Sequence, residues 1–286
     1  MKKLLILSGK GGTGKTTISA ALIRLSQAKA IADCDVDAPN LHLVVPKDSK
    51  PQRYAFMGGD KAVVDATKCS GCGACENHCR FNAIHVQDGK AIVNEYTCEG
   101  CGVCTYVCQN EAVHLEEDHA GERELYTGEQ VFSTAQLKMG RGNSGKLVTE
   151  VKLAMLKAAP ECELAITDGS PGIGCPVISS VSGMDLVLVV AEPSGSGISD
   201  LKRLCKTAET FQTQLAVCVN KYDVSIEATQ EIEDFCRDTG LPCVGKIPYD
   251  PKAIAAVNAG GSVIDTDGPA AEAIRNMYKE LKKLLY

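Results

Sequence analysis

Short apolar runs alternate with stretches of helical spacing along most of the chain. Each apolar run ends in polar or turn residues, as the buried strands of parallel sheets do. These runs are KKLLILS, KAIADCD, ELAITDGS, MDLVLVVAEP, QLAVCVNKYD and LPCVGKIPYD. Apolar residues at helical spacing occur in TTISAALIRLSQAK and in residues 147–159, 197–212, 225–238 and 269–285. We therefore expect an α/β fold, with a mostly parallel sheet covered by helices and ligands at the carboxyl ends of its strands.

This alternation stops between residues 60 and 118, where the chain contains an internal repeat. The run CSGCGACENHC recurs as CEGCGVCTYVC, and similar tails, AIHV and AVHL, follow the two runs. The repeat predicts a small pseudo-symmetric module, whose ends lie close enough for insertion into a surface loop of a larger domain. We expect residues 60–118 to form this inserted domain. Residues 1–59 and 119–286 would then form one discontinuous domain.

The overall composition is that of a soluble globular protein. Hydrophobic residues make up 44% of the chain and charged residues 23%, which excludes the low hydrophobicity and high charge of a disordered protein. No apolar stretch is long enough for a transmembrane helix, and the apolar run near the start is too short for a signal peptide. We therefore expect a cytoplasmic protein.

The negative charge is concentrated in the predicted insert. Residues 60–118 contain ten acidic and four basic side chains, so their net charge is 4 − 10 = −6, equal to the net charge of −6 of the whole chain. Nucleic-acid binding relies on lysine and arginine side chains that neutralise phosphates. The insert is therefore predicted to bind no nucleic acid, and its charge favours a basic protein partner.

Eight of the fifteen cysteines lie in the two repeated runs, and both runs have the spacing C-x2-C-x2-C-x3-C. In a long chain without a secretion signal, such clusters indicate metal ligation rather than disulfides. Two structural zinc sites are one interpretation, because C-x2-C pairs also bind zinc. The complete spacing resembles that of bacterial ferredoxins with two [4Fe–4S] clusters.

The resemblance implies a small α+β ferredoxin-like domain, in which the fourth cysteine of each run ligates the cluster of the other run. The implied ligands are Cys69, Cys72, Cys75 and Cys108 for one cluster and Cys98, Cys101, Cys104 and Cys79 for the other. The sequence departs from the family at one point, because Arg80 and Gln109 replace the proline that usually follows the fourth cysteine. All eight ligands are nevertheless present.

A phosphate-binding loop follows the first predicted strand and precedes the first predicted helix. Gly9-x4-Gly14-Lys15-Thr16 satisfies the phosphate-loop pattern in this context. The backbone amides would cradle phosphates, Lys15 would reach the β- and γ-phosphates and Thr16 would bind Mg²⁺. The predicted contacts to ATP and Mg²⁺ in this loop are Gly9, Lys10, Gly11, Gly12, Thr13, Gly14, Lys15, Thr16 and Thr17.

The form KGGTGKT resembles the deviant phosphate loop of the MinD/ParA ATPases. This resemblance implies that Lys10 crosses a two-fold interface to the phosphates bound by a partner subunit, where it acts as an arginine finger does in other ATPases. It therefore implies an ATP-dependent homodimer. The alternative is that Lys10 is a solvated loop lysine.

Three further strand ends resemble conserved parts of the same family. DCDVDAPN resembles switch I, which implies that Asp35, or Asp37 as the alternate, positions Mg²⁺ and the attacking water. TDGSPGIGCPV resembles switch II, with Asp168 as the carboxylate that binds Mg²⁺ through water. In VNKYD, the amide of Asn220 is suited to the adenine edge. The alternatives are aspartates of a strand-end turn in the first case and a plain turn in the last.

The whole chain resembles a MinD-superfamily P-loop ATPase with an inserted bacterial-type ferredoxin domain. Our leading hypothesis is a Mg²⁺-dependent ATPase, slow without its partner, whose nucleotide state gates electron transfer through the two clusters to a redox or metallocluster partner protein. One alternative is an ATPase that assembles or delivers metal clusters. Another is a positioning ATPase with a redox sensor.

Two other features are given structural interpretations. Cys175 lies in the switch II segment, but as a single cysteine it lacks the second ligand that a bridging cluster would need, and we expect a packed or reactive thiol. The helix predicted near the C-terminus carries an apolar stripe and several lysines, and we expect it to pack on the sheet rather than bind a membrane. Core positions are expected for the remaining cysteines, which are Cys34, Cys162, Cys205, Cys218, Cys236 and Cys243.

Overall fold

The computed structural model describes residues 1–286, which form two compact units. The large unit comprises residues 1–54, 123–136 and 144–286, and the small unit comprises residues 55–122 and 137–143. The predicted insert, residues 60–118, falls within the small unit. The small unit also includes residues 55–59, 119–122 and 137–143, which the prediction had assigned to the discontinuous domain.

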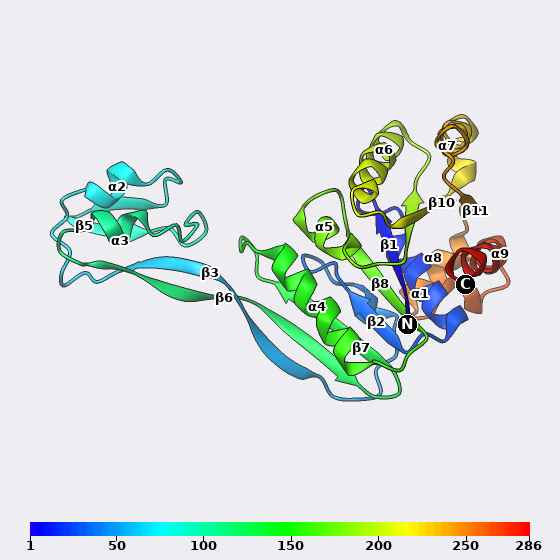
Figure 1. The fold of residues 1–286 in the computed structure, drawn as a ribbon, viewed down its shortest axis with the longest axis horizontal. Helices are drawn as coiled ribbons and strands as arrows, with labels where there is room; N and C mark the ends of the chain where they lie inside the picture. Colours follow the sequence, from blue (N-terminus) through cyan, green and yellow to red (C-terminus); the bar gives the residue numbers. More distant parts are fainter. The chain divides into compact units, whose positions relative to one another are not determined.

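A mostly parallel sheet forms the centre of the large unit (Figure 1). The strand order is β11-β10-β9-β1-β8-β2-β7-β6-β3, and neighbouring strands from β11 to β7 run parallel. The predicted strands are β1 (Lys2–Ser8), β2 (Ala30–Asp33), β8 (Leu164–Pro171), β9 (Leu186–Ala191), β10 (Gln214–Asn220) and β11 (Cys243–Ile247). The prediction of an α/β fold with a mostly parallel sheet is confirmed.

Three strands were not predicted. They are β3 (Gln52–Val64), β6 (Val113–Thr127) and β7 (Val131–Leu137). Only three residues separate β6 from its neighbour β7, so these two strands form a hairpin. β3 and β6 each contain residues of both units, and most of their side chains are exposed or half-buried. The continuous apolar runs that revealed the parallel strands are therefore absent from them.

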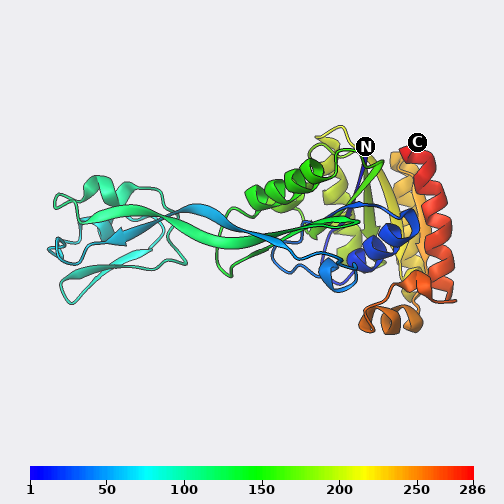
Figure 2. The same cartoon turned by 90° about the horizontal axis from the view of Figure 1, so that it is seen from below.

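Helices cover both faces of the sheet in the large unit (Figure 2). They are α1 (Lys15–Ser26), α4 (Ser144–Ala158), α5 (Cys175–Val181), α6 (Gly195–Glu209), α7 (Ile226–Thr239), α8 (Pro251–Asn258) and α9 (Pro269–Leu285), with short 3₁₀ turns at Leu41–Leu43, Tyr222–Val224 and Val263–Asp265. On β1, Leu4 and Ile6 pack with α1 and α9, whereas Leu5 and Leu7 pack with α5, α6 and α7. This alternation follows from the two-residue period of a strand.

The apolar stripe of α9 belongs to the core of the large unit. Ile274, Met277 and Leu281 are almost fully buried, against elements that include α1 and β11. None of the helices is both long enough and apolar enough to cross a lipid bilayer.

The small unit contains the same local arrangement, a glycine followed by a short helix, in two places. Helix α2 (Ala74–His78) follows Gly73, and helix α3 (Val103–Val107) follows Gly102, and both glycines have φ near 77°. The strands β4 (Ile84–Gln87) and β5 (Lys90–Val93) form an antiparallel pair. The sequence repeat therefore corresponds to a repeat of backbone conformation.

Candidate functional site

The loop between β1 and α1 needs its glycines. Gly12 and Gly14 have φ of 79° and 90°, a region that favours glycine. A Cβ on Gly14 would lie 2.3 Å from Nδ2 of Asn220, and a Cβ on Gly9 would lie 2.2 Å from Cβ of Asp200. The loop is therefore held tightly between α6 and the end of β10.

A buried ion-pair cluster lies beneath this loop. Nζ of Lys15 is 3.0 Å from Oδ1 of Asp168 and 3.7 Å from Oδ2 of Asp35. Burial alone would lower the pKa of Lys15, but the carboxylates of Asp168 and Asp35 more than offset it, and the pKa is raised above its usual value. Lys15 therefore remains a fixed positive charge at the N-terminus of α1, which already favours anions.

Asp168 also accepts hydrogen bonds from two hydroxyls of α1. Thr16 Oγ1 donates to Oδ2 at 2.8 Å, and Ser19 Oγ donates to Oδ1 at 2.7 Å. The structure thus brings together Thr16 and Asp168, two of the side chains predicted to serve Mg²⁺. Their hydroxyl and carboxylate oxygens are the ligand types that Mg²⁺ prefers.

A further buried carboxylate, that of Asp33, was missed by the sequence analysis. Its side chain accepts hydrogen bonds from the backbone amides of Asp35 (3.1 Å) and Leu41 (3.0 Å), and so shapes the turn after β2. Burial, reinforced by Asp168, raises the pKa of Asp33 to about 8. The parallel register pairs Asp33, the last residue of β2, with Asp168 of β8. The signal in the sequence was an acidic residue at the end of an apolar run.

The two switch I candidates lie in different environments. Asp35 is half-buried beside Lys15, and burial raises its pKa although Lys15 opposes the shift. The side chain of Asp37 is exposed. Asp35 is therefore the carboxylate of this pair that faces the phosphate loop.

Lys10 is held within its own chain in this structure. Its Nζ is 2.8 Å from Oε2 of Glu192 and within 3.4 Å of the hydroxyls of Ser194 and Ser196. Lys221 pairs with the other oxygen of Glu192 at 3.2 Å. Burial raises the pKa of Glu192, but the two lysines outweigh it and the net shift is downward. Sequence analysis missed Glu192, although its place after β9 was a signal.

The residues after β10 fasten the phosphate loop. The Asn220 amide donates from Nδ2 to the carbonyl oxygen of Thr13 at 2.7 Å, and Lys221 donates to the carbonyl oxygen of Gly12 at 3.2 Å. Asn220 was predicted to contact adenine. In this structure its amide nitrogen instead supports the loop, while the residue also lines the adjoining pocket.

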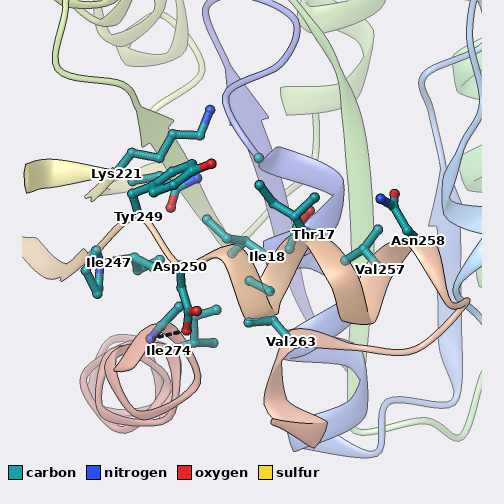
Figure 3. Close-up of a pocket in the computed structure, with 16 residues that line it drawn as sticks. Thr17, Ile18, Lys221, Ile247, Tyr249, Asp250, Val257, Asn258, Val263 and Ile274 are labelled. Atoms are coloured by element: carbon teal, nitrogen blue, oxygen red, sulfur yellow. Dashed lines mark hydrogen bonds between the residues drawn. The ribbon is translucent and has the colours of Figure 1, made fainter. Parts of the chain in front are cut away.

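That pocket begins at Gly14 (Figure 3). Thr17 and Ile18 reach it from α1, Tyr249 and Asp250 from the segment after β11, and Ile274 from α9. Its lining is mainly apolar, as is usual for small-molecule sites. A planar base attached to phosphates in the loop would therefore have an apolar compartment beside it.

In the small unit, the eight repeated cysteines line two separate cavities. One cavity is lined by Cys79, Cys98, Cys101 and Cys104. The other is lined by Cys69, Cys72, Cys75 and Cys108. Each cavity thus combines three cysteines of one run with the fourth cysteine of the other.

Backbone amides point at several of these sulfurs. Sγ of Cys69 accepts from Ala91 at 3.4 Å, Sγ of Cys79 from Ala83 at 3.4 Å and Sγ of Cys108 from Ala112 at 3.3 Å. Such donors stabilise thiolate sulfur. The structure contains no group of three or more histidine, cysteine, aspartate or glutamate side chains placed closely enough to hold a single metal ion.

Two glycines are essential to the walls of these cavities. A Cβ on Gly71 would lie 2.3 Å from the carbonyl oxygen of Gly89, and a Cβ on Gly100 would lie 2.1 Å from that of Asp60. Both glycines also have positive φ, of 70° and 62°. The backbone between the first two cysteines of each run therefore approaches a neighbouring strand or turn too closely for any side chain.

The remaining cysteines differ in exposure. Cys34, Cys205, Cys218 and Cys236 are buried, as expected, and Cys175 is exposed at the start of α5. The expectation of core positions was wrong for Cys243, which is exposed, and for Cys162, which is half-buried. Both lie at or just before the first residue of a strand, where the run of buried positions has not yet begun.

The fold and the site together define an α/β protein with a phosphate loop that binds nucleotide. Residues 4–263 match the family described as "CbiA: CobQ/CobB/MinD/ParA nucleotide binding domain", and the chain belongs to this family. The prediction of a MinD/ParA-type ATP-binding ATPase is thereby confirmed.

Relatives span nearly the whole chain. "Uncharacterized protein MJ0578" of Methanocaldococcus jannaschii is 34% identical, over 99% of this chain and 97% of its own. "Uncharacterized ATP-binding protein MJ0547" of the same organism is 28% identical, over 96% of this chain and 86% of its own. The septum site-determining protein MinD of Pyrococcus horikoshii, solved with Mg-ADP, has a TM-score of 0.60 at 18% identity, over 99% of this chain and 96% of that one. MinD of Aquifex aeolicus, solved in a MinC:MinD complex, has a TM-score of 0.58 at 19% identity, with the same coverage.

Proposed function

We propose that this protein is an ATPase whose nucleotide state gates electron transfer through two [4Fe–4S] clusters, held by the small unit, to a partner protein. The observation that carries the proposal is the composition of the two cysteine-lined cavities. Each gathers one of the two interleaved ligand sets that the ferredoxin spacing implies. On this proposal residues 60–118 are an inserted ferredoxin-like domain.

The residues of the small unit suit these clusters. A bound [4Fe–4S] cluster supplies one-electron transfer. The eight cysteines would hold the clusters as thiolates, and the amides of Ala83, Ala91 and Ala112 would stabilise the sulfurs. The four cysteines of such a cluster bind different iron atoms, so they need not converge on one point as the ligands of a single zinc ion do.

In the large unit, we assign ATP to the phosphate loop and the adjoining pocket. Lys15 would neutralise the phosphates, Thr16 and Asp168 would serve Mg²⁺, and Asp35 would orient the attacking water. The apolar pocket that begins at Gly14 would take the base, with Asn220 at its entrance. The loop amides from Gly9 to Thr17 would complete the phosphate contacts.

The contacts of Lys10 are compatible with an ATP-dependent homodimer. Lys10 and Glu192 are both partly exposed, and such a pair contributes about 1 kcal/mol or less. Hydrogen bonds to a charged phosphate contribute about 1.5–3 kcal/mol each. Exchanging Glu192 for the phosphates of a partner subunit would therefore be favourable, and Glu192 would hold Lys10 only until ATP recruits the second subunit.

Within the large unit, a chain of contacts connects the nucleotide site with helix α4. Helix α5 follows the switch II turn at Gly172–Gly174, and α4 packs on α5. Nζ of Lys152, a buried residue of α4, donates to the carbonyl oxygens of Ser179, Ser180 and Ser182 at the end of α5. A shift of switch II that moves α5 should therefore move α4.

The N-terminus of α4 continues this connection through the covalent chain. Ser144, the first residue of α4, directly follows segment 137–143 of the small unit. Within the small unit, Arg141 of this segment pairs with Asp118 at 3.2 Å and with Glu95. Because segment 137–143 and α4 are consecutive in the chain, a displacement of α4 could be passed on to this segment through the covalent backbone.

Replacing Gly145 tests this connection. A Cβ at Gly145 would lie 2.8 Å from the rotatable Oγ of Ser179 and 3.3 Å from the carbonyl oxygen of Cys175, so Gly145→Ala should turn the Ser179 hydroxyl away and disturb the packing of α4 on α5. We expect Gly145→Ala to bind Mg-ATP within a few-fold of the wild type but to lose most of the nucleotide-induced change in the cluster electron paramagnetic resonance spectrum. Gly142→Ala is the matched control, because a Cβ there meets nothing within 4 Å. An unchanged nucleotide response in Gly145→Ala would exclude this route.

The alternative functions have less support. Cluster delivery needs a labile ligand set near switch II, and there Cys175 stands as a single exposed thiol. A positioning ATPase with a membrane helix needs a free apolar stripe, and the stripe of α9 is packed in the core. Anaerobic reconstitution separates these functions: gating predicts nucleotide-dependent reduction of an acceptor with iron retained, whereas delivery predicts loss of iron and sulfide on hydrolysis. ATP-dependent attachment to vesicles, without any redox effect of nucleotide, would instead support positioning.

A further inference from the structure

A pair of cysteines outside the repeated runs lies where α7 ends and β11 begins. Cys236 is in the last turn of α7 and is 2% exposed, whereas Cys243 is the first residue of β11 and is exposed. The two thiols are hydrogen-bonded to each other. Neither the nucleotide site nor the cysteine-lined cavities use this pair.

The local backbone explains why the two thiols meet. Gly240 ends α7 in the left-handed conformation, with φ of 70°, and Leu241 N donates to the carbonyl oxygen of Cys236 at 2.9 Å. This termination turns the chain back on itself. The ion pair between Glu233 of α7 and Lys246 of β11, at 2.9 Å, fastens the same two elements a turn further on. The close approach of the thiols is therefore built into the fold.

From this geometry we propose that Cys236 and Cys243 form a dithiol site that exchanges with low-molecular-weight disulfides and closes to an intramolecular disulfide. Cys243 is the accessible attacking thiol and Cys236 is the buried resolving thiol. The proposal is independent of the ATP-gated electron transfer proposed above. It assigns a redox modification to the edge of the sheet in the large unit, since β11 is the terminal strand in the sheet order.

The electrostatic surroundings favour this division of roles. The hydrogen bond from the Cys236 thiol lowers the pKa of Cys243, and the amide of Gly245 and the charge of Lys246 add to this effect. Partial desolvation and the carboxylate of Glu233 act in the opposite direction, and the resulting pKa is about 7. The same hydrogen bond, with burial, raises the pKa of Cys236. Two other groups face the pair, the buried thiols of Cys205 on α6 and Cys218 on β10. A thiol with a pKa near the ambient pH is the most effective attacking group in such exchanges.

The reaction balances with a disulfide R–S–S–R as the oxidant. The Cys243 thiolate attacks one sulfur, the S–S bond breaks, and one R–S⁻ leaves as a mixed disulfide forms on Cys243. Cys236 then loses its proton, and its thiolate attacks the Cys243 sulfur and expels the second R–S⁻. Two protein thiols and one R–S–S–R thus yield one protein disulfide and two R–SH, with two electrons passed to the small molecule.

Peptide mapping tests the proposal directly. The anaerobic holoprotein is incubated with graded ratios of oxidised to reduced glutathione, quenched in acid, alkylated and digested with trypsin without reduction. Cleavage after Lys221, Arg237 and Lys246 places Cys236 in peptide 222–237 and Cys243 in peptide 238–246. We expect the disulfide-linked pair of these peptides to appear as the ratio rises and to disappear when reduced glutathione is restored.

Single variants distinguish the two roles. Cys236→Ser should trap glutathione on Cys243 as a stable mixed disulfide, whereas Cys243→Ser should yield neither the linked peptides nor a glutathione adduct on Cys236. Cys175→Ser, which removes an exposed cysteine elsewhere, should leave the linked pair unchanged. Wild-type protein in which both cysteines stay alkylatable at every ratio, or in which Cys243 accumulates a mixed disulfide without linking to Cys236, would overturn the proposal.

The pH dependence provides a second readout on the same protein. The rate of alkylation of Cys243 by iodoacetamide should rise through a midpoint near pH 7, because the thiolate is the reacting species. In Cys236→Ser, a serine hydroxyl replaces the thiol that donates to Cys243. The pH midpoint of Cys243 alkylation should therefore differ from that of the wild type. A Cys243 midpoint at the value of an ordinary thiol in the wild type would contradict the assigned attacking role.

Discussion

Replacing Lys15 with glutamine should lower the rate of Mg²⁺-dependent ATP hydrolysis by about 10²–10³-fold, the usual effect of removing one electrostatic group that stabilises a transition state. Lys15 is the buried cation of the cluster, 3.0 Å from Asp168 and 3.7 Å from Asp35. Without it, no ammonium at the start of α1 would neutralise the charge that develops on the phosphates. Phosphate release, measured with saturating Mg-ATP, is the readout.

Two comparisons make this measurement specific. Lys29→Gln, which removes an exposed lysine, should hydrolyse ATP at the wild-type rate. Lys15→Gln also leaves the nearby buried carboxylates unpaired, so its circular dichroism and melting temperature should be recorded to show that it is folded. Hydrolysis within a few-fold of the wild type by folded Lys15→Gln would show that the phosphate loop is not the catalytic centre.

Replacing Cys79 with serine should remove about half of the iron and acid-labile sulfide, since each of the two clusters holds four iron atoms. The lost cluster should be that of Cys98, Cys101 and Cys104, because Cys79 shares their cavity. The cluster held by Cys69, Cys72, Cys75 and Cys108 should remain. Iron and sulfide assays on anaerobically reconstituted protein measure this directly.

Double variants test the interleaved ligand sets. Cys79→Ser combined with Cys101→Ser should lose no more iron than Cys79→Ser alone, because both residues would hold the same cluster. Cys79→Ser combined with Cys72→Ser should lose nearly all of it. Cys175→Ser lies outside the small unit and should keep its full iron content. The opposite pattern of the two double variants would assign each run of cysteines to its own cluster, and wild-type protein that binds no iron would exclude the clusters altogether.

The sequence predicted the parallel core of the fold because its strands are buried on both faces. Runs such as LLIL of β1 and LVLVVA of β9 are continuous in apolar residues, and such runs are diagnostic. β3 and β6 were missed because charged and small residues interrupt them, so neither contains the continuous apolar run that marks a buried strand. Segment 137–143 of the small unit was missed because it lies outside the repeat.

The nucleotide site was predicted where local motifs encode it and missed where tertiary contacts do. Lys15, Thr16 and Asp168 belong to motifs with a fixed spacing or order, and the structure brings them together. The positions of Asp33 and Glu192 at strand ends are visible in the sequence, but no spacing reveals their partners. These are nearby backbone amides for Asp33 and the distant lysines Lys10 and Lys221 for Glu192. The apolar pocket depends on α8 and α9 packing beside α1, which only the folded chain shows.

The central claim is that the bound nucleotide and the cluster oxidation state affect each other, and the reduction potentials of the clusters test it most directly. They should be measured anaerobically by redox titration with Mg-ATP, with Mg-ADP and without nucleotide, in the wild type and in Lys10→Ala. If oxidation of a cluster changes nucleotide affinity tenfold, linkage requires the potential to shift by about 59 mV for a one-electron couple. We expect a shift of at least this size between Mg-ATP and Mg-ADP in the wild type, and no shift in Lys10→Ala. Identical potentials in all three nucleotide states of the wild type would contradict it.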